Sequence, residues 1–183
     1  MLITHNREKL INTILFFSEN TDYCGKIKLF KLLYFLDFEH YKVTGRSITG
    51  MDYFAWKMGP VPVELYEEIE SPEPDMAAVL QFESIPTQFK PMLRIVAKKS
   101  FDKSHFTKRE MMMMQKLASE YKATKADDMI EATHLENTPW DKVYNQQGKR
   151  NTLIPYELAF RSQEIDMMAH VAQAHKEALA ALR

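Results

Sequence analysis

The stretch that decides the fold runs from Lys28 to Ile69 and reads KLFKLLYFLDFEHYKVTGRSITGMDYFAWKMGPVPVELYEEI. Its first part belongs to a helix that we expect over residues 26–44, and this helix is apolar on most of its sides. A helix of that kind is buried by its neighbours. Gly45 follows, where a helix C-terminal glycine belongs. The sequence therefore predicts one central helix around which the rest of the chain packs.

The second part of this stretch changes from helical to extended character. Bulky aromatic and β-branched residues between 46 and 58 favour a short extended segment, and Gly59 with Pro60 ends it in a turn. Pro62 then suits the first turn of another helix. We expect this turn to bring the extended segment back towards the central helix.

The flanking segments predict further helices. Apolar residues recur at helical spacing over residues 6–19. The run from Thr107 to Glu110 is a capping box that opens a second helical group. Thr124 and Thr138 are placed to cap two later helices.

A small amount of sheet and one terminal helix complete the expected architecture. Residues 91–99 alternate as a strand does, and Ser162 is placed to cap a last helix over about 162–183. We therefore predict a mainly α (α+β) fold. It is a single domain over residues 1–183, a helical bundle around a buried central helix with a small antiparallel β element. The core motif covers about residues 26–70.

Composition narrows the class of protein. Of the 183 residues 45% are hydrophobic and 27% charged, which is ordinary for a globular chain, and the formal net charge of -1 does not favour a nucleic-acid binder. Cys24 is the one cysteine, so no disulfide can form within the chain. Neither a signal peptide nor a stretch long enough to span a bilayer is evident. These features predict a soluble cytoplasmic protein.

Sequence motifs for cofactor or metal chemistry are missing. The five glycines do not form a phosphate-binding loop, and no HExxH occurs. His170 and His175 are five residues apart, whereas ligands on one helical face need three or four. Cys24 is better interpreted as a small buried residue than as a nucleophile. We therefore expect no cofactor, no metal and no catalytic residue.

One group of polar residues leaves an enzymatic alternative open. Asp37 and His40 lie near the end of the central helix, and His134 precedes a capped helix. A carboxylate on a largely apolar helix needs a polar partner, which we expect to be the backbone of the 54–60 turn or Lys57. If the three groups converge on a pocket, they could serve a hydrolase or a nucleotide-modifying enzyme instead.

Several residues are candidates for contact with a partner protein. Methionine adapts well at protein-binding surfaces, and four successive methionines cover every face of one helical turn. The last helix carries a narrow apolar stripe that suits its own core, a second copy or another helix. We also expect the aromatic residues around Tyr53 and Phe54 to be exposed. The candidate partner-binding residues are Tyr53, Met111, Met112, Met113, Met114, Met168 and Leu179.

The stretch quoted above closely resembles the Panacea domain, the family that includes the SocA-type antitoxins. Its pattern is a Lys-Leu-x-Lys-Leu-Leu-Tyr-Phe helix, a Thr-Gly turn and a Phe-x-Ala-Trp-x-x-Gly-Pro-Val segment. Further on, THLENTPW resembles the family's His-x-x-x-x-x-Trp region. The residues that carry the resemblance are Lys28, Leu29, Lys31, Leu32, Leu33, Tyr34, Phe35, Thr44, Gly45, Phe54, Ala55, Trp56, Gly59, Pro60, Val61, Leu65, Tyr66, His134 and Trp140.

The resemblance implies a function in binding rather than in catalysis. Members of this family are antitoxins that neutralise a cognate toxin protein by direct contact, and relatives occur in prophages. Some relatives are described as adaptors that deliver the toxin to a bacterial protease, so a protease is a second implied partner. The resemblance supplies no catalytic residues. Self-association stays open, and a nucleic-acid-binding regulator is the third alternative, with Lys98, Lys99, Lys103, Lys108 and Arg109 as its basic cluster.

The motif is then best interpreted as the interior of the fold. We expect the leucines of the central helix and Phe35 to pack with Phe54 and Trp56, with Gly59 and Pro60 fixing the turn between them. Burial of each such side chain is worth roughly 1.5–3 kcal/mol. Recognition of a partner would in that case fall to the outer surface.

Overall fold

The computed structural model describes residues 5–86 and 91–160, together with Ala174 and Glu177. The helix expected over about 162–183, with Met168 and Leu179, lies outside the described residues. The remaining elements form a mainly helical fold with small antiparallel sheets, which confirms the predicted fold class.

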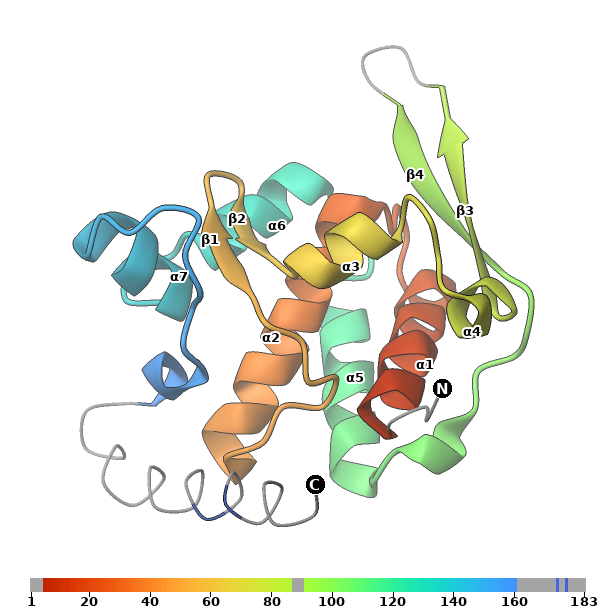
Figure 1. Ribbon diagram of the computed structural model, residues 1–183, viewed down its shortest axis with the longest axis horizontal. Helices are drawn as coiled ribbons and strands as arrows, with labels where there is room; N and C mark the ends of the chain where they lie inside the picture. The colour runs from red at the N-terminus through yellow and green to blue at the C-terminus, as the bar shows by residue number, and fades with distance from the viewer. Residues whose placement is uncertain (1–4, 87–90, 161–173, 175–176, 178–183) are drawn as a thin grey trace.

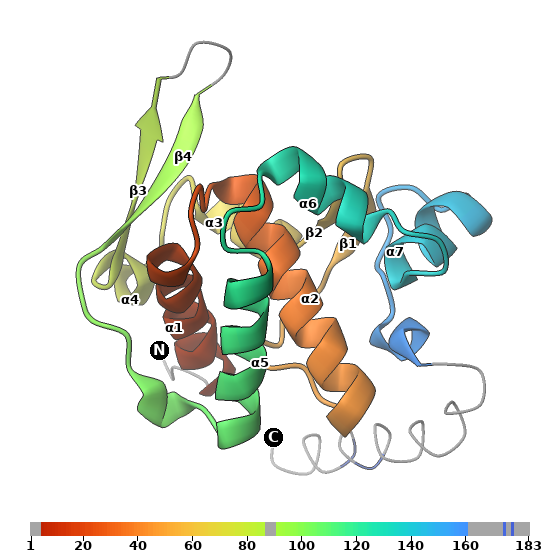
Figure 2. The same ribbon diagram turned by 180° about the vertical axis from the view of Figure 1, so that it is seen from behind.

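Helix α2 (Lys26–Thr44) is the centre of the molecule. It lies among α1 (His5–Asn20), α5 (Lys108–Glu120) and α6 (Ala126–Thr133), as both overall views show (Figure 1, Figure 2). Its leucines are fully buried at the contacts with these helices, and they are Leu29, Leu32, Leu33 and Leu36. Gly45 ends the helix with φ 70°, and its N–H donates to the carbonyl of Tyr41. The prediction of a buried central helix that ends at Gly45 is confirmed.

The expected β element is present as two separate antiparallel sheets. Strands β1 (Phe54–Trp56) and β2 (Gly59–Val61) form the first, which lies against α2. Strands β3 (Leu80–Ile85) and β4 (Met92–Ala97) form the second, which projects from the body (Figure 1). The strand expected over 91–99 therefore exists, but it pairs with β3 and not with the segment next to the central helix.

Short helices connect these parts. Helices α3 (Val63–Glu68) and α4 (Pro74–Ala77) lie between the two sheets in sequence, and the 3-10 turn η1 (Lys103–His105) precedes α5. Helix α7 (Pro139–Asp141) continues as the π turn η2 (Lys142–Gln146), and a further 3-10 turn, η3, covers Tyr156–Ala159.

Of the four predicted helix caps, two are confirmed, one is wrong, and the one at Ser162 lies outside the described residues. Thr107 and Glu110 form the capping box of α5, and Thr138 accepts a hydrogen bond from the backbone N–H of Asp141. The cap expected at Thr124 is wrong, since α6 begins after Lys125 with no side-chain cap. The carbonyl of Thr124 instead accepts a hydrogen bond from the Lys28 ammonium at 2.8 Å.

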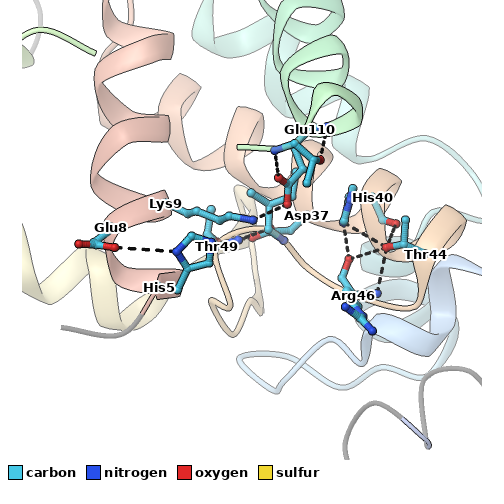
Figure 3. A network of polar contacts seen from close by, with 11 residues as sticks. His5, Glu8, Lys9, Asp37, His40, Thr44, Arg46, Thr49 and Glu110 are labelled. Carbon is cyan, nitrogen blue, oxygen red and sulfur yellow. Dashed lines mark hydrogen bonds and ion pairs between the residues drawn. The ribbon is translucent and has the colours of Figure 1, made fainter. Parts of the chain in front are cut away.

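Ion pairs tie α1 to the rest of the molecule. Arg7 forms hydrogen bonds to Glu68 at the end of α3 and to Asp75 in α4. Lys9 donates to Glu110 of α5 at 2.6 Å, and both side chains are buried (Figure 3). Although burial opposes it, the hydrogen bond from Lys9 holds the pKa of Glu110 below its usual value. In the described part of the chain, no helix combines the length and apolar character that a membrane crossing demands.

Candidate functional site

The first lysine of the motif joins two turns at one end of α2. Lys28 is fully buried, and its Nζ donates to the carbonyls of Asp22 at 2.7 Å, Lys122 at 3.0 Å and Thr124 at 2.8 Å. Burial lowers the pKa of this amine. The ammonium has three donors, so these carbonyls use all of them. Lys28 therefore fixes the turn before α2 to the turn between α5 and α6.

The second lysine of the motif holds the first hairpin. Lys31 is 2% exposed, and its Nζ donates to the carbonyl of Pro60 in β2 at 2.9 Å. Burial lowers its pKa to about 7. Gly59 has φ +95°, and a Cβ added there would lie 2.7 Å from Thr133 Oγ1 and 2.8 Å from Lys31 Nζ. Both the backbone conformation and the close contacts require glycine at this turn.

His134 and Trp140 close the other side of the same hairpin. Their rings stack with centroids 3.8 Å apart, and Trp140 Nε1 donates to the carbonyl of Trp56 at 2.9 Å. Burial, with a smaller contribution from Lys31, lowers the pKa of His134. His134 Nε2 and Tyr34 Oη are buried and have no hydrogen-bond partner among the described residues. Lys31 and Trp140 are almost inaccessible and His134 is half-buried, so this cluster fixes β1 and β2 between α2 and α6.

The motif aromatics do not all reach the interior. Tyr34 is 2% exposed, whereas Phe35, Phe54 and Trp56 are half-buried at the edge of the core. Phe35 stacks on Tyr121 with centroids 5.4 Å apart. The leucines of α2 thus form the core as expected, and the rings of Phe35 and Trp56 pack against its margin.

Asp37 has a structural partner different from the one expected. Its carboxylate accepts hydrogen bonds from the backbone N–H groups of Ile48 and Thr49 at 2.7 and 2.8 Å, and from the hydroxyls of Thr49 and Tyr53. Asp37 and Thr49 are labelled in Figure 3. Burial raises the pKa of Asp37, and these four donors act against the rise. Asp37 therefore holds the segment after α2. It contacts neither the 54–60 turn nor Lys57.

His40 is held in the same way, apart from Asp37. Its Nδ1 lies 2.7 Å from the carbonyl of Arg46 and 3.2 Å from Thr44 Oγ1 (Figure 3). Across the described residues, no hydrogen bond links Asp37, His40 and His134. A cavity of about 530 Å³ is lined by Tyr34, yet Glu39 is the one acid among its described lining residues. The convergence that a catalytic site would need is not found there.

The candidate partner-binding residues differ in accessibility. Tyr53 is fully buried because its hydroxyl donates to Asp37, so the expectation that it is exposed is wrong. Met114 is also fully buried, while Met111 and Met113 are half-buried. Met112 is 69% exposed. Of the candidate residues that the structure describes, Met112 alone offers most of its side chain to a partner.

A larger apolar surface lies elsewhere, beside the projecting hairpin. A groove of about 770 Å³ opens between the start of α2, the start of α6 and β4. We call it the hairpin groove. Its described lining residues are Tyr23, Gly25, Lys26, Ile27, Lys28, Glu70, Ser84, Pro91, Met92, Leu93, Lys125, Ala126 and Asp127.

The hairpin groove gathers exposed apolar side chains. Tyr23 is 62% exposed, and Ile27 and Met92 are each 39% exposed. On its rim, Lys26 Nζ lies 3.7 Å from the ring centroid of Tyr66 and 3.3 Å from a carboxylate oxygen of Glu70. Sequence reasoning missed this surface. Its one local signal was Ile27, an apolar residue on the side of α2 that faces away from the core.

The motif residues that meet at the first hairpin all lie within a range that one protein-family model matches. The family model described as antitoxin SocA-like, Panacea domain, matches residues 29–141, which is more than half of the chain. The chain belongs to this family. The matched range of the Panacea domain runs from α2 to α7 and includes both sheets. Neither the search of curated proteins nor that of solved structures returned a match.

Membership of the SocA-like family implies a general kind of partner. A protein of an antitoxin family has a toxin as its partner. In this Panacea domain the motif residues Lys31, Gly59 and Trp140 are buried. Their contacts join the first hairpin to α2 and α7.

Proposed function

We propose that this Panacea-domain protein neutralises a toxin protein by direct stoichiometric binding and catalyses no reaction. The hairpin groove is the observation that carries the proposal. Contiguous exposed apolar surface on a soluble chain marks an interaction site far more often than isolated apolar residues do. The groove brings Tyr23, Ile27 and Met92 to one place, whereas the motif lysines Lys28 and Lys31 are buried.

The chemistry of the groove suits a protein partner. Tyrosine and methionine supply large contact area at protein interfaces. Polar groups of both signs stand around this apolar centre, with Lys26 and Glu70 paired on one side and Lys125 and Asp127 at the start of α6. An apolar centre with a mixed polar rim is the usual anatomy of an interface between proteins. The groove therefore fits an apolar segment of the toxin flanked by charged side chains.

The other roles implied by the family need surfaces of their own. Delivery of a bound toxin to a protease would require a second contact site, and the exposed Met112 on α5 is the candidate for it. Self-association would use the apolar stripe that the sequence predicts for the last helix, which includes Met168 and Leu179. We also infer that the protein acts in the cytoplasm, which its lone Cys24 supports.

The two remaining alternatives have less support. An enzyme using Asp37, His40 and His134 would need groups within reach of one reacting atom, and Asp37 and His40 are bound to separate parts of the 44–53 segment. A nucleic-acid-binding regulator would need an unbroken basic face. Acids interrupt the 98–109 cluster at Asp102, and Lys98 donates to the carbonyl of Ala77.

Co-expression tests the proposal. The product of the adjacent gene is expressed alone and together with this chain, and growth and complex formation are measured. We expect toxicity of the neighbour alone, rescue on co-expression, and a complex of fixed stoichiometry in size-exclusion chromatography. Rescue without a complex, or a neighbour that is harmless alone, would contradict neutralisation by direct contact.

A further inference from the structure

Two histidines and a carboxylate meet at the start of α1. His5 and Glu8 are one helical turn apart, and His105 reaches them from η1. His5 Nδ1 lies 3.8 Å from Glu8 Oε2, and His105 Nδ1 lies 3.6 Å from the same oxygen (Figure 3 shows His5 and Glu8). One ligand atom from each of the three residues can be chosen so that all lie within 4.8 Å of one another.

This spacing is close to that of a metal centre. Zinc binds histidine nitrogen and carboxylate oxygen at about 2.0–2.2 Å in a tetrahedron, which puts neighbouring ligand atoms about 3.4 Å apart. The distances to the Glu8 oxygen exceed that value by a few tenths of an ångström. The His5 side chain is 63% exposed, so its ring has space to rotate towards the Glu8 oxygen.

A second carboxylate stands where a zinc-bound histidine needs one. Asp102 Oδ2 lies 3.5 Å from His105 Nε2, the ring nitrogen opposite the one that faces Glu8. Histidines that bind metals usually donate their other N–H to a carboxylate, which fixes the tautomer and the ring orientation. With Nε2 of His105 on the side of Asp102, Nδ1 is the ring nitrogen left to face Glu8 and a metal ion.

Asp102 is itself held in place. Its Oδ1 accepts a hydrogen bond from the backbone N–H of Ser104 at 2.8 Å, and its own N–H donates to Asn12 Oδ1 at 2.9 Å. The orientation of His105 is thus prepared by the polypeptide chain and by α1.

We propose that His5, Glu8 and His105 bind one Zn²⁺ ion and that Asp102 positions His105. The donor set of two nitrogens and one oxygen favours zinc over magnesium and calcium, which prefer oxygen ligands. Glu8, Asp102 and His105 are among the residues that line a hollow of about 430 Å³, from which a water molecule could supply the fourth ligand. The ion would join α1 to η1. Its two ligands on α1, His5 and Glu8, lie before residues 29–141, which the family model matches.

Zinc titration of the purified, untagged full chain tests this site. After treatment with a chelator, ZnCl2 is added and binding is followed by competition with a chromophoric chelator, with a thermal melt in parallel. We expect one ion per chain and a higher melting temperature with zinc. Asp102→Asn should weaken the affinity by about 10- to 100-fold, as loss of such a positioning group does. His5→Gln and His105→Gln should weaken it at least as much.

A matched variant separates this site from surface binding in general. Glu8→Gln should lose affinity, whereas Glu67→Gln, an equally simple change on an exposed part of α3, should bind zinc as the unaltered chain does. Each variant is first checked for an unchanged melt without metal. Saturable binding that survives His5→Gln together with His105→Gln, or no binding at one equivalent, would overturn the proposal.

Discussion

The two hairpins of this Panacea domain differ in almost every physical respect. β1 and β2 are three residues long, and β2 is buried along its whole length. Lys31 holds this hairpin from α2, Trp140 holds it from α7, and Ala55 exchanges backbone hydrogen bonds with Asn151 and Thr152. β3 and β4 are six residues long, mostly half-buried or exposed, and project from the body (Figure 1, Figure 2).

The difference separates what specifies the fold from what meets a partner. The buried hairpin is joined to the central helix by polar groups that have no room to move, so a change there must alter the fold. The projecting hairpin contributes Met92 and Leu93 to an open groove, so a change there can alter recognition alone. The following predictions test that division, beginning with the largest expected effect.

Gly59→Ala should cause the greatest loss of stability. The added Cβ would lie within 3.0 Å of Thr133 Oγ1 and of Lys31 Nζ, and the residue would also keep φ +95°. We expect a loss of about 3 kcal/mol or more in the free energy of unfolding, measured by denaturant titration. Gly148→Ala is the matched control. Gly148 has φ +65° but nothing within 4 Å of an added Cβ, so its loss should be about 1 kcal/mol. Equal losses would show that crowding at the buried hairpin is unimportant.

Asp37→Ala should be the next most destabilising change. It leaves the buried N–H groups of Ile48 and Thr49 without an acceptor, and an unpaired buried donor costs about 1–3 kcal/mol. We expect a loss of about 3 kcal/mol in the free energy of unfolding. Asp52→Ala in the same segment removes an exposed carboxylate and should change stability by less than about 0.5 kcal/mol. If thermal melts of the two variants agree, Asp37 does not hold this segment.

Lys31→Met should change how stability depends on pH. The Lys31 pKa is about 7 in the folded protein and 10.5 in the unfolded chain, so between these values the unfolded state binds the extra proton. The free energy of unfolding therefore rises with pH in this window, by up to about 1.4 kcal/mol per pH unit from this group. Denaturant titrations from pH 7 to 9 should show a smaller slope for the variant. Equal slopes would mean that the buried amine stays protonated.

Met112→Gln should have the smallest effect. The side chain is 69% exposed on α5, away from the lining of the hairpin groove. Removing one exposed methionine from outside an interface changes affinity by a factor of about two at most. Toxin binding measured by calorimetry should therefore match that of the unaltered chain. A tenfold loss would move the toxin-binding surface to α5.

The sequence predicted the helices better than the contacts between them. The central helix, its end at Gly45 and the capping box at Thr107 follow from local patterns, and all three are confirmed. The burial of Lys28 could not be foreseen, because two of its three carbonyl partners lie 94 and 96 residues away along the chain. A polar residue within an apolar helix shows that a polar partner is needed, but it does not identify that partner.

The candidate site was least predictable where it depends on several segments. The apolar pattern around Tyr53 is compatible with either a buried or an exposed side chain. In the structure Tyr53 is buried, and its hydroxyl donates to Asp37. Alternation within 91–99 indicates a strand but does not identify its partner. The hairpin groove combines residues from 23–28, 91–93 and 125–127 with Glu70 and Ser84, so it exists only after the chain has folded.

The most direct test of the division between the two hairpins is toxin binding by the double variant Ile27→Gln/Met92→Gln. Val43→Gln is its control, since Val43 is an exposed β-branched residue at the other end of α2 and outside the groove. Our account predicts binding weakened about tenfold or more by the double variant, an unchanged melting temperature, and normal binding by Val43→Gln. Full binding by the double variant, or a loss that accompanies unfolding, would contradict it.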